Sequence, residues 1–121
     1  MSVTCEFVVI TPGWNEDKES MRAVNLALHI ADTERRQTFN KLDDKAAGGS
    51  KCMSMEIWAA CFNHFIPGDV IAALVEAEWR FPERIFVCHD PGDYMAWDGW
   101  GEDYVPPWTK TIQRLREESH G

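Results

Sequence analysis

Residues 3–10 constrain the fold most strongly, because they predict a β-strand and therefore a sheet. Valine, isoleucine, threonine and phenylalanine dominate this stretch, and β-branched and aromatic side chains favour the extended conformation. Thr11, Pro12 and Gly13 follow directly and should end the strand, since proline and glycine mark turns. The remaining sequence must supply the strands that pair with it.

Residues 22–31 are predicted to be one such partner. Their large apolar side chains occupy alternate positions, which is the period of a strand with one buried face: Val24, Leu26, Leu28 and Ile30. Alanine and leucine favour a helix intrinsically, so the propensity and the period disagree in this stretch. We follow the period and expect a hairpin of residues 3–10 and 22–31 joined by a long loop.

The middle of the chain is predicted to hold a break and then a helix. Residues 32–47 are mostly polar and should form a loose helix or a long loop, and residues 48–50 (Gly-Gly-Ser) mark the clearest break. Residues 51–65 are predicted to be a buried helix. Their apolar side chains recur at intervals of three and four residues, as on one face of a helix: Met55, Trp58, Cys61, Phe62 and Phe65.

Three further elements are predicted in the second half. Residues 69–79 should form a second helix, with Asp69 placed to cap its free N–H groups. Residues 84–89 (RIFVCH) read as a strand, and the tail 109–119 has the pattern of a short amphipathic helix through Ile112 and Leu115.

Together these elements predict an α+β fold over a single domain, residues 1–121. The hairpin 3–10/22–31 and the strand 84–89 form a small antiparallel or mixed sheet, and the helices 51–65 and 69–79 pack on one side of it. The other face of the sheet, or an edge, then stays available for a partner.

The charge of the chain narrows the classes of partner. The sequence holds 20 acidic and 12 basic residues, for a net charge of −8. This balance argues against direct nucleic-acid binding and against anionic membranes, and it favours basic protein surfaces. No stretch approaches the about 20 apolar residues that span a bilayer, and the cysteines lie in apolar contexts that suit reduced thiols. We therefore expect a cytoplasmic protein.

The segment from His89 to Trp108 is the strongest functional candidate. It concentrates aromatic and acidic side chains and has no lysine or arginine. Large aromatics tend to be buried while acids are not, so the segment should be half anchored and half exposed. We expect Trp108 to anchor the segment to the core. We also expect a short strand near residues 94–97. The predicted partner-binding residues are Asp90, Asp93, Tyr94, Trp97, Asp98, Trp100, Glu102 and Asp103.

An alternative site would use cysteine and histidine. Cys61, His64 and one of Cys88 or His89 could bind zinc, with Cys52 as a fourth ligand, if the fold brings them together. The same cysteine and histidine residues could instead form a thiol nucleophile with its base. No Cys-x2-Cys pair announces such a site, so we expect core roles for these residues, without metal or cofactor. The spacing of the acids does not match a calcium loop, whereas a carboxylate pair for sugar hydrolysis stays open.

These observations favour an acidic protein-interaction domain over an enzyme. Aromatic residues favour interface hot spots, and complementary charge speeds the encounter with a basic partner. An inhibitor or immunity-type protein directed at a basic protein, such as a nucleic-acid-binding one, fits this character. The alternative is a small enzyme or a metal- or ligand-binding protein that uses the cysteine and histidine residues. Exposed aromatics would also allow a homodimer.

Overall fold

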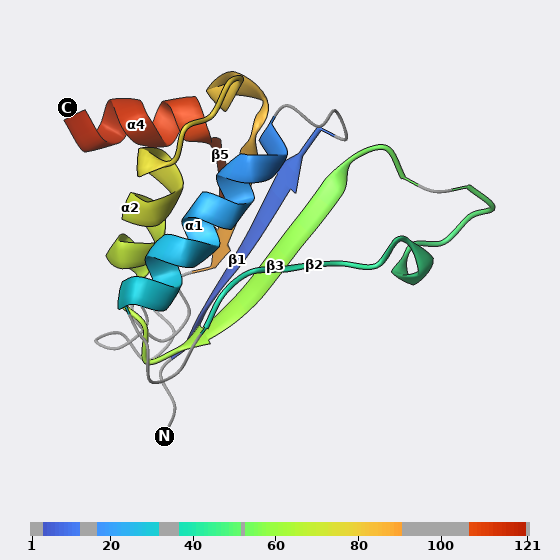
Figure 1. The fold of residues 1–121 in the computed structure, drawn as a ribbon, viewed down its shortest axis with the longest axis horizontal. Coiled ribbons are helices and arrows are strands. Elements are labelled where there is room, and N and C mark those ends of the chain that lie inside the picture. Colours follow the sequence, from blue (N-terminus) through green and yellow to red (C-terminus); the bar gives the residue numbers. More distant parts are fainter. Residues whose placement is uncertain (1–3, 13–16, 32–36, 52, 91–106, 121) are drawn as a thin grey trace.

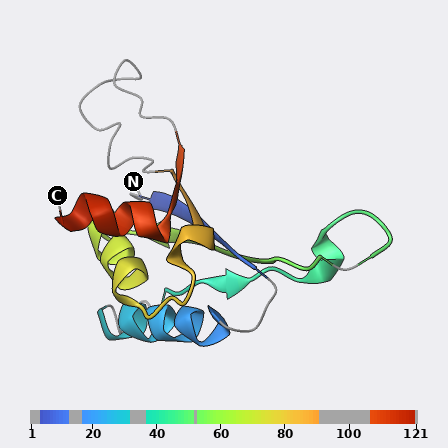
Figure 2. The ribbon, with the colours of Figure 1, turned by 90° about the horizontal axis from the view of Figure 1, so that it is seen from above.

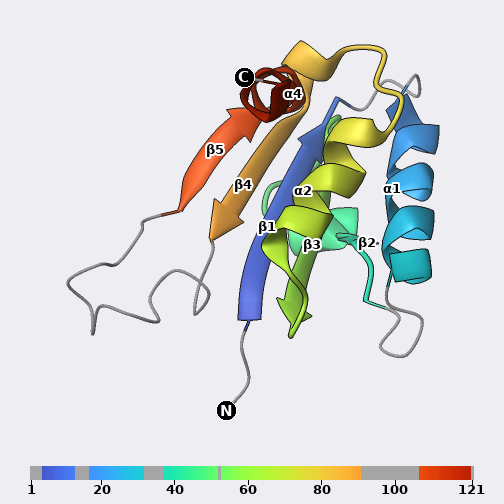
Figure 3. The same cartoon turned by 90° about the vertical axis from the view of Figure 1, so that its left-hand side faces the viewer.

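A computed structural model describes residues 4–12, 17–31, 37–51, 53–90 and 107–120. These residues form an antiparallel sheet of five strands in the order β2-β3-β1-β4-β5, with three α-helices gathered on one of its sides (Figures 1 and 3). The predicted α+β class is confirmed. Strand β1 (Thr4–Thr11), predicted at 3–10, lies at the centre of the sheet.

Strand β1 pairs along its whole length with β3 (Glu56–Asn63) and, from Glu6 to Ile10, with β4 (Phe86–Asp90). Cys5, Phe7 and Val9 point toward the helices and are buried, because alternate residues of a strand face opposite sides. Phe7 meets the rings of Phe39 and Phe62 edge to face, at centroid distances of 6.4 and 6.0 Å. This aromatic group fills the core between the sheet and the helices.

The predicted strand at 22–31 is wrong, because this segment belongs to helix α1 (Lys18–Ala31). Met21, Val24 and Leu28 share one helical face and are fully buried in the core. Leu26 and Ile30 produce the misleading alternation from the opposite, exposed face of the same helix. The helix propensity of alanine and leucine, and not the alternating period, indicated the correct structure for this segment.

The predicted helix at 51–65 is also wrong, because its second half is strand β3. Trp58, Ala60 and Phe62 face the helices, while the positions between them are apolar as well and point the other way. A strand that is apolar on both faces gives a continuous run whose period cannot separate it from a buried helix. The strand ends at Asn63, and His64 follows with a positive φ of 56°.

Helix α2 (Pro67–Glu76) confirms the prediction at 69–79, with the helix shifted toward the N-terminus. Asp69 was predicted to be its cap, but Ile66 occupies that position and makes no side-chain cap, so Asp69 sits inside the first turn. At the other end, Arg116 donates from Nε to the Val75 carbonyl at 2.9 Å and from a terminal nitrogen to the Ala77 carbonyl at 2.7 Å. A guanidinium thus satisfies carbonyls that the helix end leaves open.

The C-terminal elements follow the sequence closely. Strand β4 matches the predicted strand at 84–89. Helix α4 (Ile112–His120) confirms most of the helix predicted at 109–119, but residues 109–111 form a strand instead. Strand β5 (Trp108–Thr111) leads directly into α4 and forms the sheet edge beside β4. A short 3₁₀ helix, η3 (Pro82–Arg84), precedes β4. The expected strand near 94–97 lies outside the described residues.

Residues 32–47 were predicted to be a loose helix or a long loop. Their described part holds strand β2 (Asn40–Lys41) and the 3₁₀ helix η2 (Asp44–Ala46). The chain between β2 and β3 projects from the body as an arm (Figure 2). Ser20 Oγ donates to the Glu78 carbonyl, and Asp17 Oδ1 accepts from the Arg80 amide at 2.7 Å, so the start of α1 is fixed to the chain after α2. Across the described residues, every helix is too short or too polar to traverse a bilayer.

Candidate interaction surface

The candidate interaction surface is the face of the sheet that is turned away from the helices. Strand register places its side chains in rows across β3, β1 and β4. We call this surface the open face. Its members are Cys61, Glu6 and Asp90 in the first row, Ala59, Val8 and Cys88 in the second, and Ile57, Ile10 and Phe86 in the third.

The second and third rows make the centre of the open face apolar. Ile10 lies directly across from Ile57 on one side and Phe86 on the other, and Phe86 leaves 45% of its surface exposed. An antiparallel sheet with one solvated face normally alternates apolar and polar residues. Here the second and third rows place apolar residues on this face as well, which is typical of a sheet covered on both sides. The helices cover only one.

The first row gives the open face an acidic border. Glu6 and Asp90 are cross-strand neighbours, an arrangement that is unfavourable for two like charges. Glu6 is exposed, and the strand positions that face this side contain no lysine or arginine within the described residues. Lys110 of β5 lies on the opposite side, where it bridges Glu118 of α4 at 2.8 Å. The acidic row thus lies at the Glu6 and Asp90 end of the open face, whereas the hollow beside Phe86 is lined by both signs of charge, with Lys110 and Arg114 next to Glu83 and Glu117.

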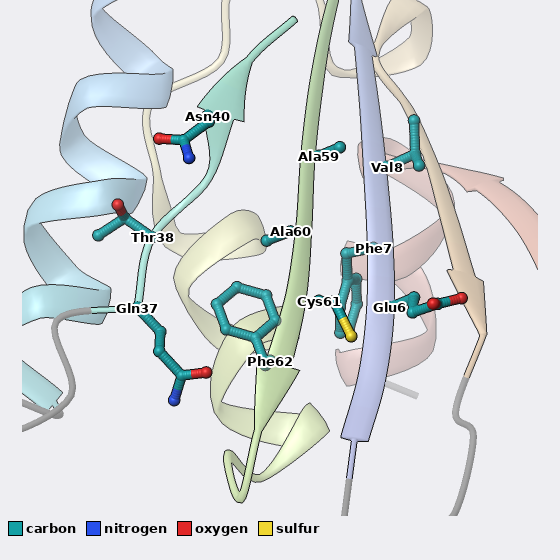
Figure 4. Close-up of a pocket in the computed structure, with 10 residues that line it drawn as sticks. All are labelled: Glu6, Phe7, Val8, Gln37, Thr38, Asn40, Ala59, Ala60, Cys61 and Phe62. Atoms are coloured by element: carbon teal, nitrogen blue, oxygen red, sulfur yellow. The ribbon is translucent and has the colours of Figure 1, made fainter.

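A hollow of about 740 Å³ opens between β3 and the chain that precedes β2. In Figure 4, Gln37, Thr38 and Asn40 line one side, and residues of β3 line the other. The Gln37 side chain holds the end of β3: its Nε2 donates to the Asn63 carbonyl at 2.9 Å and its Oε1 accepts from the Asn63 amide at 2.6 Å. Small side chains on the β3 side, Ala59 and Ala60, leave the space between the two chains unfilled.

The far wall of the hollow is fixed to helix α1. Asn25 Nδ2 donates to the Phe39 carbonyl at 3.1 Å, and Asn25 Oδ1 accepts from the Phe39 amide at 2.8 Å. At this edge, the side-chain amides of Asn25 and Gln37 therefore form hydrogen bonds with backbone groups that a neighbouring strand would otherwise satisfy. The exposed thiol of Cys61 points to the open side of the hollow, next to Glu6 (Figure 4).

The predicted partner-binding residues are described at one position only. Asp90 ends β4 and belongs to the acidic row of the open face. The others, Asp93, Tyr94, Trp97, Asp98, Trp100, Glu102 and Asp103, lie outside the described residues. Trp108, expected to be an anchor, is half-buried against the core, and its ring meets His89 edge to face at 4.9 Å.

The alternative site residues are spread over both sides of the sheet. Cys61 and Cys88 lie on the open face with β1 between them, His64 is exposed beyond the end of β3, and His89 is buried on the helix side. Cys52 lies outside the described residues. Among the described side chains, no three His, Cys, Asp or Glu groups come close enough to hold a metal ion.

His89 and Cys5 occupy core environments that explain their chemistry. His89 is 4% exposed, stacks on Phe7 at 4.1 Å, and finds no hydrogen-bond partner for either ring nitrogen among the described residues. Burial lowers the pKa of His89, an effect that the nearby Asp90 carboxylate partly opposes. Burial, with a smaller effect of Cys61, raises the pKa of Cys5 to about 11. Both groups are neutral at pH 7.

Comparison with protein-family models, with curated proteins and with solved structures found no significant match. The open face is therefore the basis for the proposed function. Sequence analysis missed most of this surface, although a signal was present. Val8 and Ile10, like Ile57 and Ala59, fill strand positions that a solvated face would give to polar residues.

Proposed function

We propose that this chain is a protein-interaction domain whose open face binds a basic surface of another protein, as an inhibitor or immunity-type protein does. The observation that carries the proposal is the arrangement of the open face. An apolar centre around Ile10, Ile57 and Phe86 is bordered by the carboxylates of Glu6 and Asp90. Protein interfaces have this anatomy, with a desolvated apolar core and a polar border.

The charge of the border favours a cationic partner. Glu6 is exposed on this face, and a lysine or arginine from a partner would pair with its carboxylate. The chain continues from Asp90 into a stretch with four more acids and no base, which extends the negative charge in the sequence. With a net charge of −8, attraction to a basic protein acts over the range of the Debye length.

A nucleic-acid-binding protein is the partner class that we favour. Such proteins carry basic surfaces that neutralise phosphates, and an acidic surface with interspersed apolar contacts competes for those surfaces. The described cysteines are free thiols, in keeping with the cytoplasm as the compartment that we propose.

The test measures binding to a partner captured from extract of the natural source cells. Affinity of the purified pair is measured by calorimetry at low and high salt, for the wild type and for matched variants. Glu6→Lys reverses a charge on the open face, and Glu76→Lys makes the same change on the exposed surface of α2. We expect a basic partner, binding that weakens as salt rises, and a loss of roughly tenfold or more for Glu6→Lys alone.

A second pair of variants tests the apolar centre. Phe86 and Leu42 are almost equally exposed, at 45% and 46%, but Leu42 lies on the arm between β2 and η2. Phe86→Ala should weaken binding by roughly thirtyfold, as expected for an aromatic hot spot, and Leu42→Ala should have little effect. Equal effects of the paired variants, or binding that does not respond to salt, would refute the proposal.

A further inference from the structure

Helix α1 presents a second apolar surface on the side opposite the core. Ala23, Leu26, Ala27 and Ile30 recur at the spacing of one helical face, and all of them are exposed. Leu26 is 59% exposed and Ile30 68%. The core uses Met21, Val24 and Leu28 from the other side of the helix. A helix that is apolar on both sides has the pattern of one buried on both sides.

The apolar surface continues beyond the end of the helix. Ala31, the last residue of α1, shares a small hollow with Ile66, which precedes α2 and is 62% exposed. In Figure 1 the C-terminal end of α1 lies beside the start of α2, in agreement with this contact. We call this surface, Ala23, Leu26, Ala27, Ile30 and Ile66, the α1 stripe.

Its charge distinguishes the α1 stripe from the open face. From Ala23 to Ala31 the helix has no Asp, Glu, Lys or Arg. At its start, Glu19 and Arg22 pair with each other at 3.0 Å, so their charges cancel locally. The helical part of the stripe thus offers no acid to a basic partner, and the exposed Asp69 lies only at the Ile66 end, where it lines the small hollow. Two copies of a chain with a net charge of −8 repel each other, and an uncharged surface is where they meet at the least electrostatic cost.

We propose that the α1 stripe pairs two copies of this chain, with their α1 helices antiparallel about a two-fold axis between Leu26 and Ala27. In this register Leu26 lies opposite Ala27 of the second copy, and Ile30 lies opposite Ala23. Each large side chain thus covers a small one, which allows the helices to pack closely. A parallel pair would place large against large and leave the alanines facing each other.

The ends of the helices fit the same arrangement. Arg22 and Ala31 are equally far from the axis in sequence, so Arg22 of one copy lies level with the last residue of the other copy's helix. In the pair this guanidinium would interact with the partly negative carbonyl end of the other helix in addition to its bond with Glu19. The contact is smaller than a standard interface of about 20 residues a side, so the dimer should be weak and concentration-dependent.

The test is sedimentation velocity over a concentration series, at low and high salt. We expect the dimer to strengthen as salt rises, because salt screens the repulsion between the copies; binding of a basic partner at the open face should respond in the opposite direction. Leu26→Glu should raise the dissociation constant roughly a hundredfold. Leu42→Glu, an equivalent change on the arm, should leave it unchanged. Because Leu26 is exposed, circular dichroism should show the same fold for the variant.

A size exchange tests the antiparallel register. Ala23→Ile brings two isoleucines together and Ile30→Ala two alanines, so each single variant should weaken the dimer by roughly tenfold. The double variant restores a large side chain opposite a small one and should approach the wild type. A monomer at all concentrations, a dimer unaffected by Leu26→Glu, or one strengthened by Ala23→Ile would overturn the proposal.

Discussion

Replacing His89 with phenylalanine should make the protein more stable, and increasingly so at low pH. The imidazole is buried with both nitrogens unpartnered within the described residues. An unsatisfied polar group costs about 1–3 kcal/mol, and an apolar ring removes that cost. Phenylalanine keeps the stack on Phe7 and the edge contact with Trp108. At pH 7 we expect the free energy of unfolding to rise by about 1 kcal/mol, because fitting the slightly larger phenyl ring offsets part of the stabilisation.

The pH dependence follows from the lowered pKa of His89. In the unfolded chain the imidazole takes up a proton below about pH 6.5, whereas burial disfavours the charged form in the folded protein. The unfolded state therefore binds more protons, and the stability of the fold decreases as the pH is lowered. Each pH unit below 6.5 costs the wild type up to about 1.4 kcal/mol. Between pH 6.5 and pH 5 the variant therefore gains up to about 2 kcal/mol on the wild type.

Urea denaturation followed by tryptophan fluorescence, at pH 7 and pH 5 and constant ionic strength, measures both effects. The other histidines are common to the two proteins, so the difference between them isolates His89. If the difference in unfolding free energy between the variant and the wild type were the same at pH 7 and pH 5, His89 would take up its proton equally well in the folded and unfolded states. A histidine that does so cannot be buried without a partner, so this result would refute the prediction.

Three further predictions concern the fold. Leu28→Ala should lower the free energy of unfolding by about 2–5 kcal/mol because Leu28 is fully buried, whereas Leu26→Ala should change it by less than about 0.5 kcal/mol in the monomer; urea denaturation at low protein concentration distinguishes the two faces of α1. Iodoacetamide should modify Cys61, which is exposed, long before Cys5, whose pKa is raised to about 11, as followed by peptide mass spectrometry. Arg116→Lys should cost about 1–2 kcal/mol of stability in a thermal melt, because an ammonium cannot reproduce the two bonds that the guanidinium makes to the end of α2.

The sequence predicted the elements whose local signals agree with one another. In β1 and β4, β-branched residues and flanking turn residues point to the same structure, and α2 begins with Pro67 at a favoured position. The wrong predictions concern segments that have apolar side chains on two opposite faces of the same element. Leu26 and Ile30 follow the period of a strand only because they belong to a second, exposed face of α1.

The candidate site shows the same limitation. Asp90 was predicted, but its neighbours Glu6 and Cys61 lie far from it in the sequence and join it through strand register alone. A single sequence does not specify which strands pair, so rows across a sheet cannot be read from it. The apolar residues on both faces of β3 also hid this strand in the sequence, because a continuous apolar run is equally typical of a buried helix.

Methyl and amide NMR of the labelled chain, titrated with its captured basic partner, can locate the docking surface residue by residue. We expect the largest chemical-shift changes at Val8, Ile10 and Ile57, with smaller ones at Glu6 and Asp90, and we expect all of them to fade as salt rises. Changes confined to α2 and α4, with these five residues unaffected, would show that the open face is not the docking surface.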